Sequence, residues 1–135
     1  MKTRTQQLPS TAERDKLAPQ REQHALPELP IRCAACGHPL ATPDDALTIN
    51  GEHQHTFINP AGVVFEIRCF IRALGVSPVG ASSDYWSWFP GYRWQLCNCG
   101  NCAIHIGWLF IAADDRFYGL ICGALHDSGV HEAQR

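Results

Sequence analysis

Two short runs, Cys33-Ala34-Ala35-Cys36 and Cys99-Gly100-Asn101-Cys102, carry the clearest structural signal in this sequence. Two residues between cysteines allow both thiolates to bind one metal ion from a single tight turn. Two such CxxC turns supply the four thiolates of a structural zinc site, which leaves no open position for water. Because a long segment separates the two pairs, the site would join the two ends of a small domain. We therefore predict one structural zinc ion bound by Cys33, Cys36, Cys99 and Cys102.

Other residues near the two CxxC pairs offer alternative ligands. His38 follows the first pair, and Cys97 precedes the second pair in a C-x-C-x-x-C arrangement. The matched spacing favours the four paired cysteines over both. Buried free thiols or redox-labile pairs are the alternative interpretation of the CxxC runs. The remaining cysteines lie in apolar runs, where a free cysteine acts as a small hydrophobic residue: Cys69, Cys97 and Cys122.

The composition is that of one globular domain. The chain has 135 residues, of which 45% are hydrophobic and 18% are charged. A net charge of −2 provides no general basic surface, so a nucleic-acid partner is not predicted. The N-terminal segment has no apolar run for a signal peptide or a membrane span. Seven cysteines, an odd number, then favour metal binding over disulfides, and we expect a cytoplasmic protein without a membrane partner.

The polarity of the chain divides it into three parts. Residues 1–29 are polar and contain several prolines, so we expect a disordered N-terminal tail, in which only residues 11–17 could form a short helix. The folded domain is expected over residues 30–127. A C-terminal tail over residues 128–135 completes the chain.

The domain itself has the pattern of antiparallel strands. Asn59-Pro60-Ala61-Gly62 is a turn signal between two strand-like runs, which predicts a β-hairpin. In the second run, alternate residues from Val63 to Cys69 share a face that we expect to be half-buried. Ala73 to Ser83 is rich in Gly, Pro and Ser and is predicted to be a loop. Strands are predicted over residues 56–58, 63–70, 94–98, 104–111 and 116–121, which makes the fold class mainly β.

The segment from Asp84 to Trp94 is too aromatic for an ordinary loop. Pro90-Gly91 fits the central positions of a type II turn, across which Trp88 and Trp94 could meet. Trp108 and Phe110 are two residues apart on a predicted strand, so they project from one face. A hydrophobic core is the simpler interpretation of such rings. Indoles beside turn residues favour a box at the surface, because burying all of them would require partners for every N–H.

Three histidines have simpler interpretations than metal binding or catalysis. His53 and His55 could provide half of a metal site, but we expect solvated loop residues. His105 alternates with Ile104 and Ile106 and is therefore expected on the face opposite to Trp108. We predict that it is a hydrogen-bonded structural residue.

An aromatic box has two physical uses. It can hold a cation by attraction to the ring faces, or it can hold a flat, partly apolar ring. A cyclic imide suits the second use, because its methylenes can meet the indoles while its N–H and carbonyls need backbone partners. An extended backbone over Trp86-Ser87-Trp88 could offer a carbonyl and an N–H from alternate residues. Spacing alone does not choose between the cation and the imide.

The combined motifs resemble a known family. The run from Ser87 to Trp94, the second CxxC pair and the run from His105 to Phe110 are similar to the thalidomide-binding (CULT) domain of cereblon. Residues 59–62 and 117–120 fit the same pattern, in the same order. The resemblance implies a β-tent, in which two antiparallel sheets meet at an angle and are pinned by the Cys₄ zinc. It also implies a single-domain, bacterial-type cereblon, for which no ubiquitin-ligase partner is expected.

The same resemblance implies a ligand site. Trp88, Trp94 and Trp108 would form its walls and Phe110 its base. Backbone near Trp86 and Trp88 would meet the polar atoms of the imide. Family ligands include glutarimides of the thalidomide class, uridine-like rings and protein C-termini that end in a cyclised glutamine or asparagine. This chain has Trp86 where the human-type domain has a histidine, so only backbone hydrogen bonds to the imide are expected at that position. The implied ligand-binding residues are Asn59, Pro60, Trp86, Ser87, Trp88, Trp94, Trp108 and Phe110.

Two other function classes remain as alternatives to this non-catalytic module. Methionine sulfoxide reductases of the B type share the architecture, but they require an Arg-(Phe/Tyr)-Cys-x-Asn stretch. This chain has Arg116-Phe117-Tyr118-Gly119 instead, with Cys122 displaced. A cage for methylated cations would need a nearby carboxylate, and the aromatic segment offers only Asp84.

Overall fold

The computed structural model describes residues 29–127, so both predicted tails and the helix considered over residues 11–17 lie outside the described part. Within residues 29–127 the fold is mainly β, as predicted, and all strand pairs are antiparallel. Two 3₁₀ turns, η1 Pro43–Asp45 and η2 Cys122–Ala124, are the only helical elements of this part. Neither is long enough to cross a membrane.

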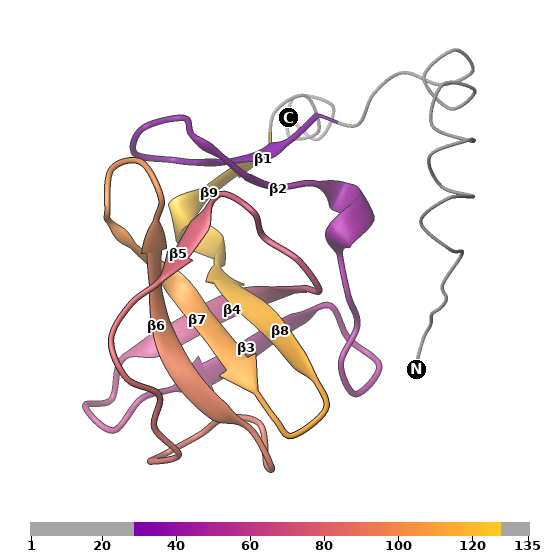
Figure 1. Ribbon diagram of the computed structural model, residues 1–135, viewed down its shortest axis with the longest axis vertical. Coiled ribbons are helices and arrows are strands. Elements are labelled where there is room, and N and C mark those ends of the chain that lie inside the picture. The colour runs from indigo at the N-terminus through magenta and orange to yellow at the C-terminus, as the bar shows by residue number, and fades with distance from the viewer. Residues whose placement is uncertain (1–28, 128–135) are drawn as a thin grey trace.

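The strands form two sheets (Figure 1). The larger has the order β3-β4-β8-β7-β6-β5, with β3 Gln54–Ile58, β4 Val64–Phe70, β5 Val76–Pro78, β6 Arg93–Cys99, β7 His105–Ile111 and β8 Arg116–Ile121. The smaller has the order β2-β1-β9, with β1 Ile31–Cys33, β2 Pro39–Ala41 and β9 Leu125–Asp127. The small sheet lies across one end of the large sheet, so the two sheets meet at an angle.

The predicted hairpin is present as β3 and β4. The side chain of Asn59 holds its turn, because Asn59 Oδ1 accepts hydrogen bonds from the backbone N–H groups of Ala61 and Val63, both at 2.9 Å. This is the local bonding by which asparagine favours turns. Of the face predicted from Val63 to Cys69, three side chains of β4 face the interior, Phe65, Ile67 and Cys69, whereas Val63 precedes the strand and is 48% exposed.

The segment predicted as a loop over residues 73–83 contains a short strand. Val76–Pro78 forms β5 at the edge of the large sheet and pairs with β6. Val76 is 8% exposed and belongs to the core, while Pro78 lacks an N–H and is tolerated on an edge strand. Three residues are too few to produce an alternating pattern, so the sequence gives no sign of this strand.

Two hydrophobic clusters fill the interior. The first joins the small sheet to the large one and includes Leu40 and Phe70. The second is rich in rings: Phe89 lies edge-on to Phe110 and Phe117, with ring centroids 4.8 and 5.0 Å apart. This aromatic cluster provides a firm base on one side of the large sheet.

Two of the unpaired cysteines belong to the core. Cys69 and Cys97 are fully buried, and burial raises the pKa of each thiol to about 12. Such thiols stay protonated at neutral pH, which agrees with their predicted role as small hydrophobic residues. Cys122 is half-buried, and burial raises its pKa as well.

Candidate metal centre and aromatic pocket

The two CxxC turns come together in the fold. One follows β1 and the other follows β6, and the four sulfur atoms lie within 4.8 Å of one another. Cys33 Sγ is 3.8 Å from Cys102 Sγ, and Cys36 Sγ is 3.6 Å from Cys99 Sγ. A tetrahedral ion with Zn–S bonds of about 2.3 Å requires sulfur–sulfur distances of about 3.8 Å. The four thiols are therefore positioned to hold one metal ion.

Local hydrogen bonds hold each turn. In both turns a backbone N–H donates back to the carbonyl of the first cysteine, from Gly37 at 2.8 Å in one and from Ala103 at 2.9 Å in the other. Asn101 Nδ2–H also donates to Cys36 Sγ at 3.4 Å. This hydrogen bond is the main reason that the pKa of Cys36 is lowered to about 6. A lowered pKa favours the thiolate, which is the form that binds metals.

The alternative ligands lie outside this cluster. Among residues 29–127 the sulfur cluster includes neither His38 nor Cys97, which is fully buried within β6. His53 Nδ1–H donates to a backbone carbonyl at 3.0 Å, and His53 Nε2 accepts a hydrogen bond from Arg68 Nε–H at 3.1 Å. His55 Nε2 lies 3.0 Å from another backbone carbonyl. Both histidines are therefore hydrogen-bonded parts of the fold rather than the solvated residues expected.

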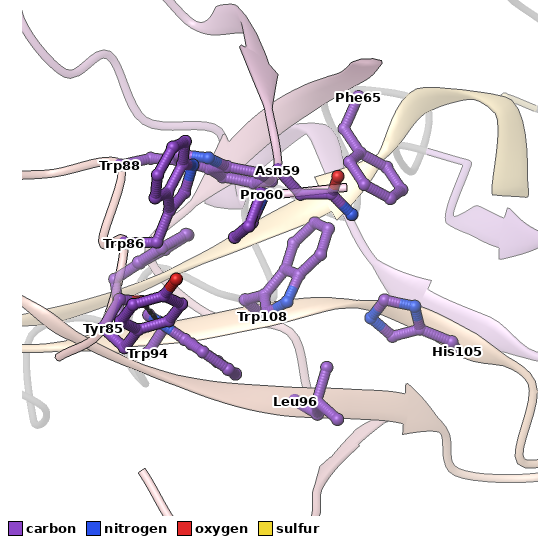
Figure 2. Close-up of a pocket in the computed structure, with 11 residues that line it drawn as sticks. Asn59, Pro60, Phe65, Tyr85, Trp86, Trp88, Trp94, Leu96, His105 and Trp108 are labelled. Carbon is purple, nitrogen blue, oxygen red and sulfur yellow. Dashed lines mark hydrogen bonds between the residues drawn. The ribbon is translucent and has the colours of Figure 1, made fainter. Parts of the chain in front are cut away.

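A pocket of about 460 Å³ opens beside the aromatic cluster (Figure 2). Strands β4, β6 and β7 contribute its sheet side, and the β3–β4 turn and the loop before β6 contribute its rim. Its lining is mostly aromatic and consists of Asn59, Pro60, Phe65, Tyr85, Trp86, Trp88, Trp94, Leu96, His105, Trp108 and Phe110.

The pairing of β6 with β7 places four pocket side chains on one face. Trp94 is opposite Phe110, and Leu96 is opposite Trp108. Residues opposite each other in an antiparallel pair project from the same side of the sheet. The prediction that Trp108 and Phe110 share a face is confirmed. Trp88 completes this group from the loop, with its ring edge-on to Trp108 at 4.8 Å.

A β-bulge in β7 overturns the expected position of His105. Gly107 and His105 are opposite consecutive residues of β6, so Ile106 is an additional residue. The extra residue shifts the alternation by one. His105 consequently lines the same pocket as Trp108, and their ring centroids are 4.9 Å apart. The alternation read from the sequence fails here because it assumes a regular strand.

Gly107, at this bulge, allows β7 and β8 to approach closely, because a side chain at position 107 would collide with the backbone carbonyl of Gly119.

The bulge also fixes the protonation state of the His105 ring. His105 Nε2–H donates to Gly107 O at 3.0 Å, which confirms the predicted hydrogen-bonded role. Burial lowers the pKa of His105 below its ordinary value, against the opposing effect of this hydrogen bond. The ring is therefore neutral at pH 7.

The predicted turn in the loop before β6 is present. Tyr92 N–H donates to Phe89 O at 3.0 Å, and Gly91 has a φ of 89°. A type II turn requires a positive φ at its third residue, which glycine adopts without strain. The turn buries Phe89, which is 3% exposed.

Trp86 departs from the expected extended backbone. Its φ of 59° is left-handed, a conformation that is uncommon for a residue with a side chain. In this arrangement the indole N–H groups of Trp86 and Trp88 both donate to Ile58 O, each at 3.0 Å. The ring of Trp88 stacks on Phe57 at 5.0 Å, while Trp94, which it was expected to meet, lines a different side of the pocket (Figure 2).

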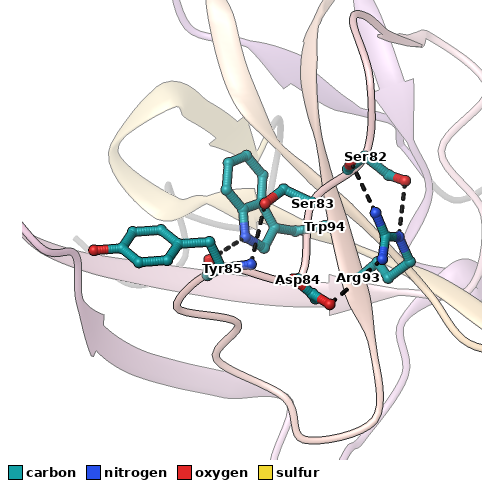
Figure 3. Close-up of polar contacts among 6 residues, drawn as sticks. All are labelled: Ser82, Ser83, Asp84, Tyr85, Arg93 and Trp94. Carbon is teal, nitrogen blue, oxygen red and sulfur yellow. Dashed lines mark hydrogen bonds and ion pairs between the residues drawn. The ribbon is translucent and has the colours of Figure 1, made fainter.

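Polar contacts hold the rim of the pocket against β6 (Figure 3). Arg93 Nε and Nη2 donate to Oγ and O of Ser82, both at 3.1 Å, and Arg93 Nη1 lies 3.5 Å from Asp84 Oδ2. The indole N–H of Trp94 donates to Tyr85 O at 2.7 Å. Asp84 is thus paired with an arginine and does not line the pocket.

The rim presents polar groups that have no partner within residues 29–127. The backbone N–H and C=O groups of Trp86, Ser87 and Trp88 make no hydrogen bond to other residues of this part. Asn59 Oδ1 is occupied by two backbone donors, which leaves the Nδ2 amide on the side of Trp108 (Figure 2). The pocket therefore combines apolar walls with backbone donors and acceptors at one edge.

The structure brings together most of the residues predicted for ligand binding. Seven of the eight line this one pocket: Asn59, Pro60, Trp86, Trp88, Trp94, Trp108 and Phe110. Ser87 is not among the lining residues, and its hydroxyl donates to Phe89 O at 3.1 Å. Only its backbone groups remain for a ligand.

Four lining residues did not emerge from the sequence: Phe65, Tyr85, Leu96 and His105. Two of them had a usable signal, because Phe65 was already predicted to face inward and Leu96 is two residues from Trp94 on a predicted strand. Tyr85 depends on the left-handed turn at the next residue, and His105 depends on the bulge. Neither feature has a signal in the local sequence.

No protein-family profile matches the chain. The chain is similar to proteins named cereblon, with 38% identity to the zebrafish (Danio rerio) protein over 74 residues, which are 51% of this chain and 17% of that protein. The Drosophila melanogaster cereblon is 35% identical over 98 residues, which are 65% of this chain and 16% of that protein. This chain therefore corresponds to one domain-sized region of cereblon proteins and spans about one sixth of their length.

Proposed function

We propose that this cereblon-type domain is a non-catalytic module that binds cyclic imides in its aromatic pocket and is held together by one structural zinc ion. The ligand class comprises glutarimides, uridine-like rings and protein C-termini that end in a cyclised glutamine or asparagine. Trp88, Trp94 and Trp108 form the walls around the ring, and Phe110 lies at the base. Asn59 and Pro60 lie alongside.

The unpaired backbone of Trp86, Ser87 and Trp88 carries this proposal. An imide has an N–H between two carbonyls on one edge and methylene groups on the other. Its polar edge needs one acceptor and two donors, and its apolar edge needs a surface without polar groups. The rim of this pocket supplies backbone donors and acceptors, and the indoles supply the apolar surface.

The size of the pocket favours an imide with a substituent. A volume of about 460 Å³ lies within the range of small-molecule sites and exceeds that of a single six-membered ring. Tyr85 and Trp86 are 64% and 51% exposed at the mouth of the pocket. These two rings are placed to contact whatever the imide ring is attached to, including a polypeptide.

Zinc is the metal that best suits the Cys₄ centre, because four thiolates at tetrahedral spacing are its usual structural ligands. When bound, it supplies a closed, four-coordinate link between the turn after β1 and the turn after β6. The reduced thiols of this centre also suit a cytoplasmic location.

Two observations weigh against the other function classes. No carboxylate lines the pocket among the described residues, so a cation would have only ring faces to balance its charge. No cysteine lines it either, so a sulfoxide reductase reaction would lack a nucleophile there.

A calorimetric titration with three ligands tests the proposal: glutarimide, N-methylglutarimide and a peptide containing trimethyl-lysine. Methylation removes the imide N–H and leaves a protein carbonyl unpaired, which costs about 1–3 kcal/mol before any clash of the methyl group. We expect glutarimide to bind and its N-methyl derivative to bind more than tenfold more weakly. Equal binding of the two imides, or preferential binding of the peptide, would contradict the proposal.

A further inference from the structure

Of the four indole N–H groups around the pocket, three have a hydrogen-bond partner in the described part of the chain and one does not. Those of Trp86 and Trp88 donate to Ile58 O at 3.0 Å, and that of Trp94 donates to Tyr85 O at 2.7 Å. The N–H of Trp108 has no hydrogen-bond partner within residues 29–127. Yet Trp108 is the most buried of the four, with only 8% of its surface exposed. Buried indole N–H groups usually have a partner, so this exception requires an explanation.

None of the described residues around Trp108 accepts a hydrogen bond from its N–H. Leu96, which is opposite it on β6, is apolar, and the ring of Phe65 meets it edge-on at 5.1 Å. His105 Nε2–H bonds to Gly107 O, so Nδ1 of the neutral ring is an acceptor, but no hydrogen bond joins it to the Trp108 N–H. Asn59 Oδ1 already accepts two backbone N–H groups.

The unpartnered N–H lies inside the ring of lining residues. Figure 2 shows Trp108 in the middle of this ring, with its indole nitrogen on the side of Leu96. A molecule that occupies the pocket would therefore meet this donor. A molecule without an acceptor there would bury the N–H with no hydrogen bond at all, which opposes its binding.

We infer that Trp108 Nε1–H is a ligand-directed hydrogen-bond donor, and that it selects ligands which bring a second carbonyl oxygen into the pocket. The inference rests on the proposed function. A carbonyl oxygen has two lone pairs, so one imide carbonyl can accept from Trp108 while the rest of the polar edge bonds to the rim backbone. Cyclic imides are then preferred over lactams, which have a similar ring and N–H but only one carbonyl.

An isosteric replacement of the indole tests this role. Trp108→β-(3-benzothienyl)alanine retains the bicyclic shape and replaces the N–H by sulfur. The comparison variant carries the same replacement at Trp94, a pocket wall whose N–H is occupied by Tyr85 O and does not face the ligand. The two ligands are glutarimide and 2-piperidone, the lactam with the same ring size. Each protein is titrated calorimetrically with both ligands.

We expect the wild-type protein to prefer glutarimide over 2-piperidone. The Trp108 replacement should weaken glutarimide binding roughly three- to tenfold, the range for one hydrogen bond. It should weaken 2-piperidone less, because the lactam can turn its single carbonyl toward the rim. The Trp94 replacement should weaken both ligands by the same factor, because it alters a pocket wall without removing a donor that faces the ligand. Equal losses for both ligands in the Trp108 replacement, or an unchanged affinity for glutarimide, would overturn the inference.

The result also separates this inference from the proposed function. If the wild-type protein fails to bind glutarimide, the proposed function and the inference fall together. If the wild-type protein binds glutarimide and the Trp108 replacement binds it equally well, only the donor role of Trp108 is wrong.

Discussion

Strand β6 carries Trp94 near one end and Cys99 at the other, so the aromatic pocket and the metal centre share one element. The metal centre consists of two tight turns whose sulfur atoms face one another. The pocket draws its lining from three strands and two loops, and it leaves backbone groups and one indole N–H without partners in the described part. The first site brings together two segments that are distant in the sequence, whereas the second is a pocket whose unpartnered polar groups we propose bind an imide.

Loss of one metal ligand should have the largest effect of the changes considered, because it should remove both the metal ion and the folded state. We expect Cys99→Ser to abolish metal binding and cooperative unfolding, because structural zinc sites contribute about 10–16 kcal/mol of apparent binding energy, which is comparable with the whole stability of a small domain. The measurements are zinc per chain by elemental analysis and thermal unfolding by circular dichroism. Cys97→Ala, on the same strand but outside the sulfur cluster, is the matched control and should keep one zinc ion. A folded, metal-free Cys99→Ser protein would show that the centre does not support the fold.

Truncation of a side chain inside the pocket should weaken ligand binding and leave metal binding unchanged. Trp108→Ala should weaken glutarimide binding by about 2–4 kcal/mol, the range for an aromatic hot spot, while zinc content stays at one per chain. Trp86→Ala should weaken binding much less, because Trp86 is 51% exposed and is proposed to act through its backbone. Calorimetry gives the affinities. Wild-type affinity in Trp108→Ala would place the ligand elsewhere.

The smallest expected effect is that of His105 ionisation on the pH dependence of stability. Burial lowers its pKa in the folded protein, whereas the unfolded chain has the ordinary value of about 6.5. Below pH 6.5 the unfolded state therefore binds a proton that the folded state does not, and stability falls as the pH decreases toward the folded pKa. His105→Gln should lose this part of the pH dependence. Urea unfolding of both proteins at pH 7 and pH 5.5 measures the change in unfolding free energy between the two pH values. The same change in both proteins would contradict the assignment of this pH dependence to His105.

The two sites also differ in how far the sequence predicts them. The metal centre depends on spacing within two turns, so the CxxC pattern alone identifies all four cysteines. The walls of the pocket follow from strand alternation at Trp108 and Phe110. The remaining parts of the pocket depend on two backbone irregularities that no local sequence pattern indicates. These are the bulge that turns His105 toward the pocket and the left-handed backbone at Trp86. The edge strand β5 was missed for the same reason, since only its pairing with β6 defines it.

A ¹H–¹⁵N NMR titration of the zinc-bound protein with glutarimide tests the division between the two sites most directly. Backbone amides report the loop from Trp86 to Trp88, indole signals report the four tryptophans, and the amide of Asn101 reports the metal centre. We predict saturable shifts at the loop amides and at the Trp108 indole N–H, with little change at Asn101. Shifts centred on the cysteine turns, or none at the loop and Trp108, would contradict the account.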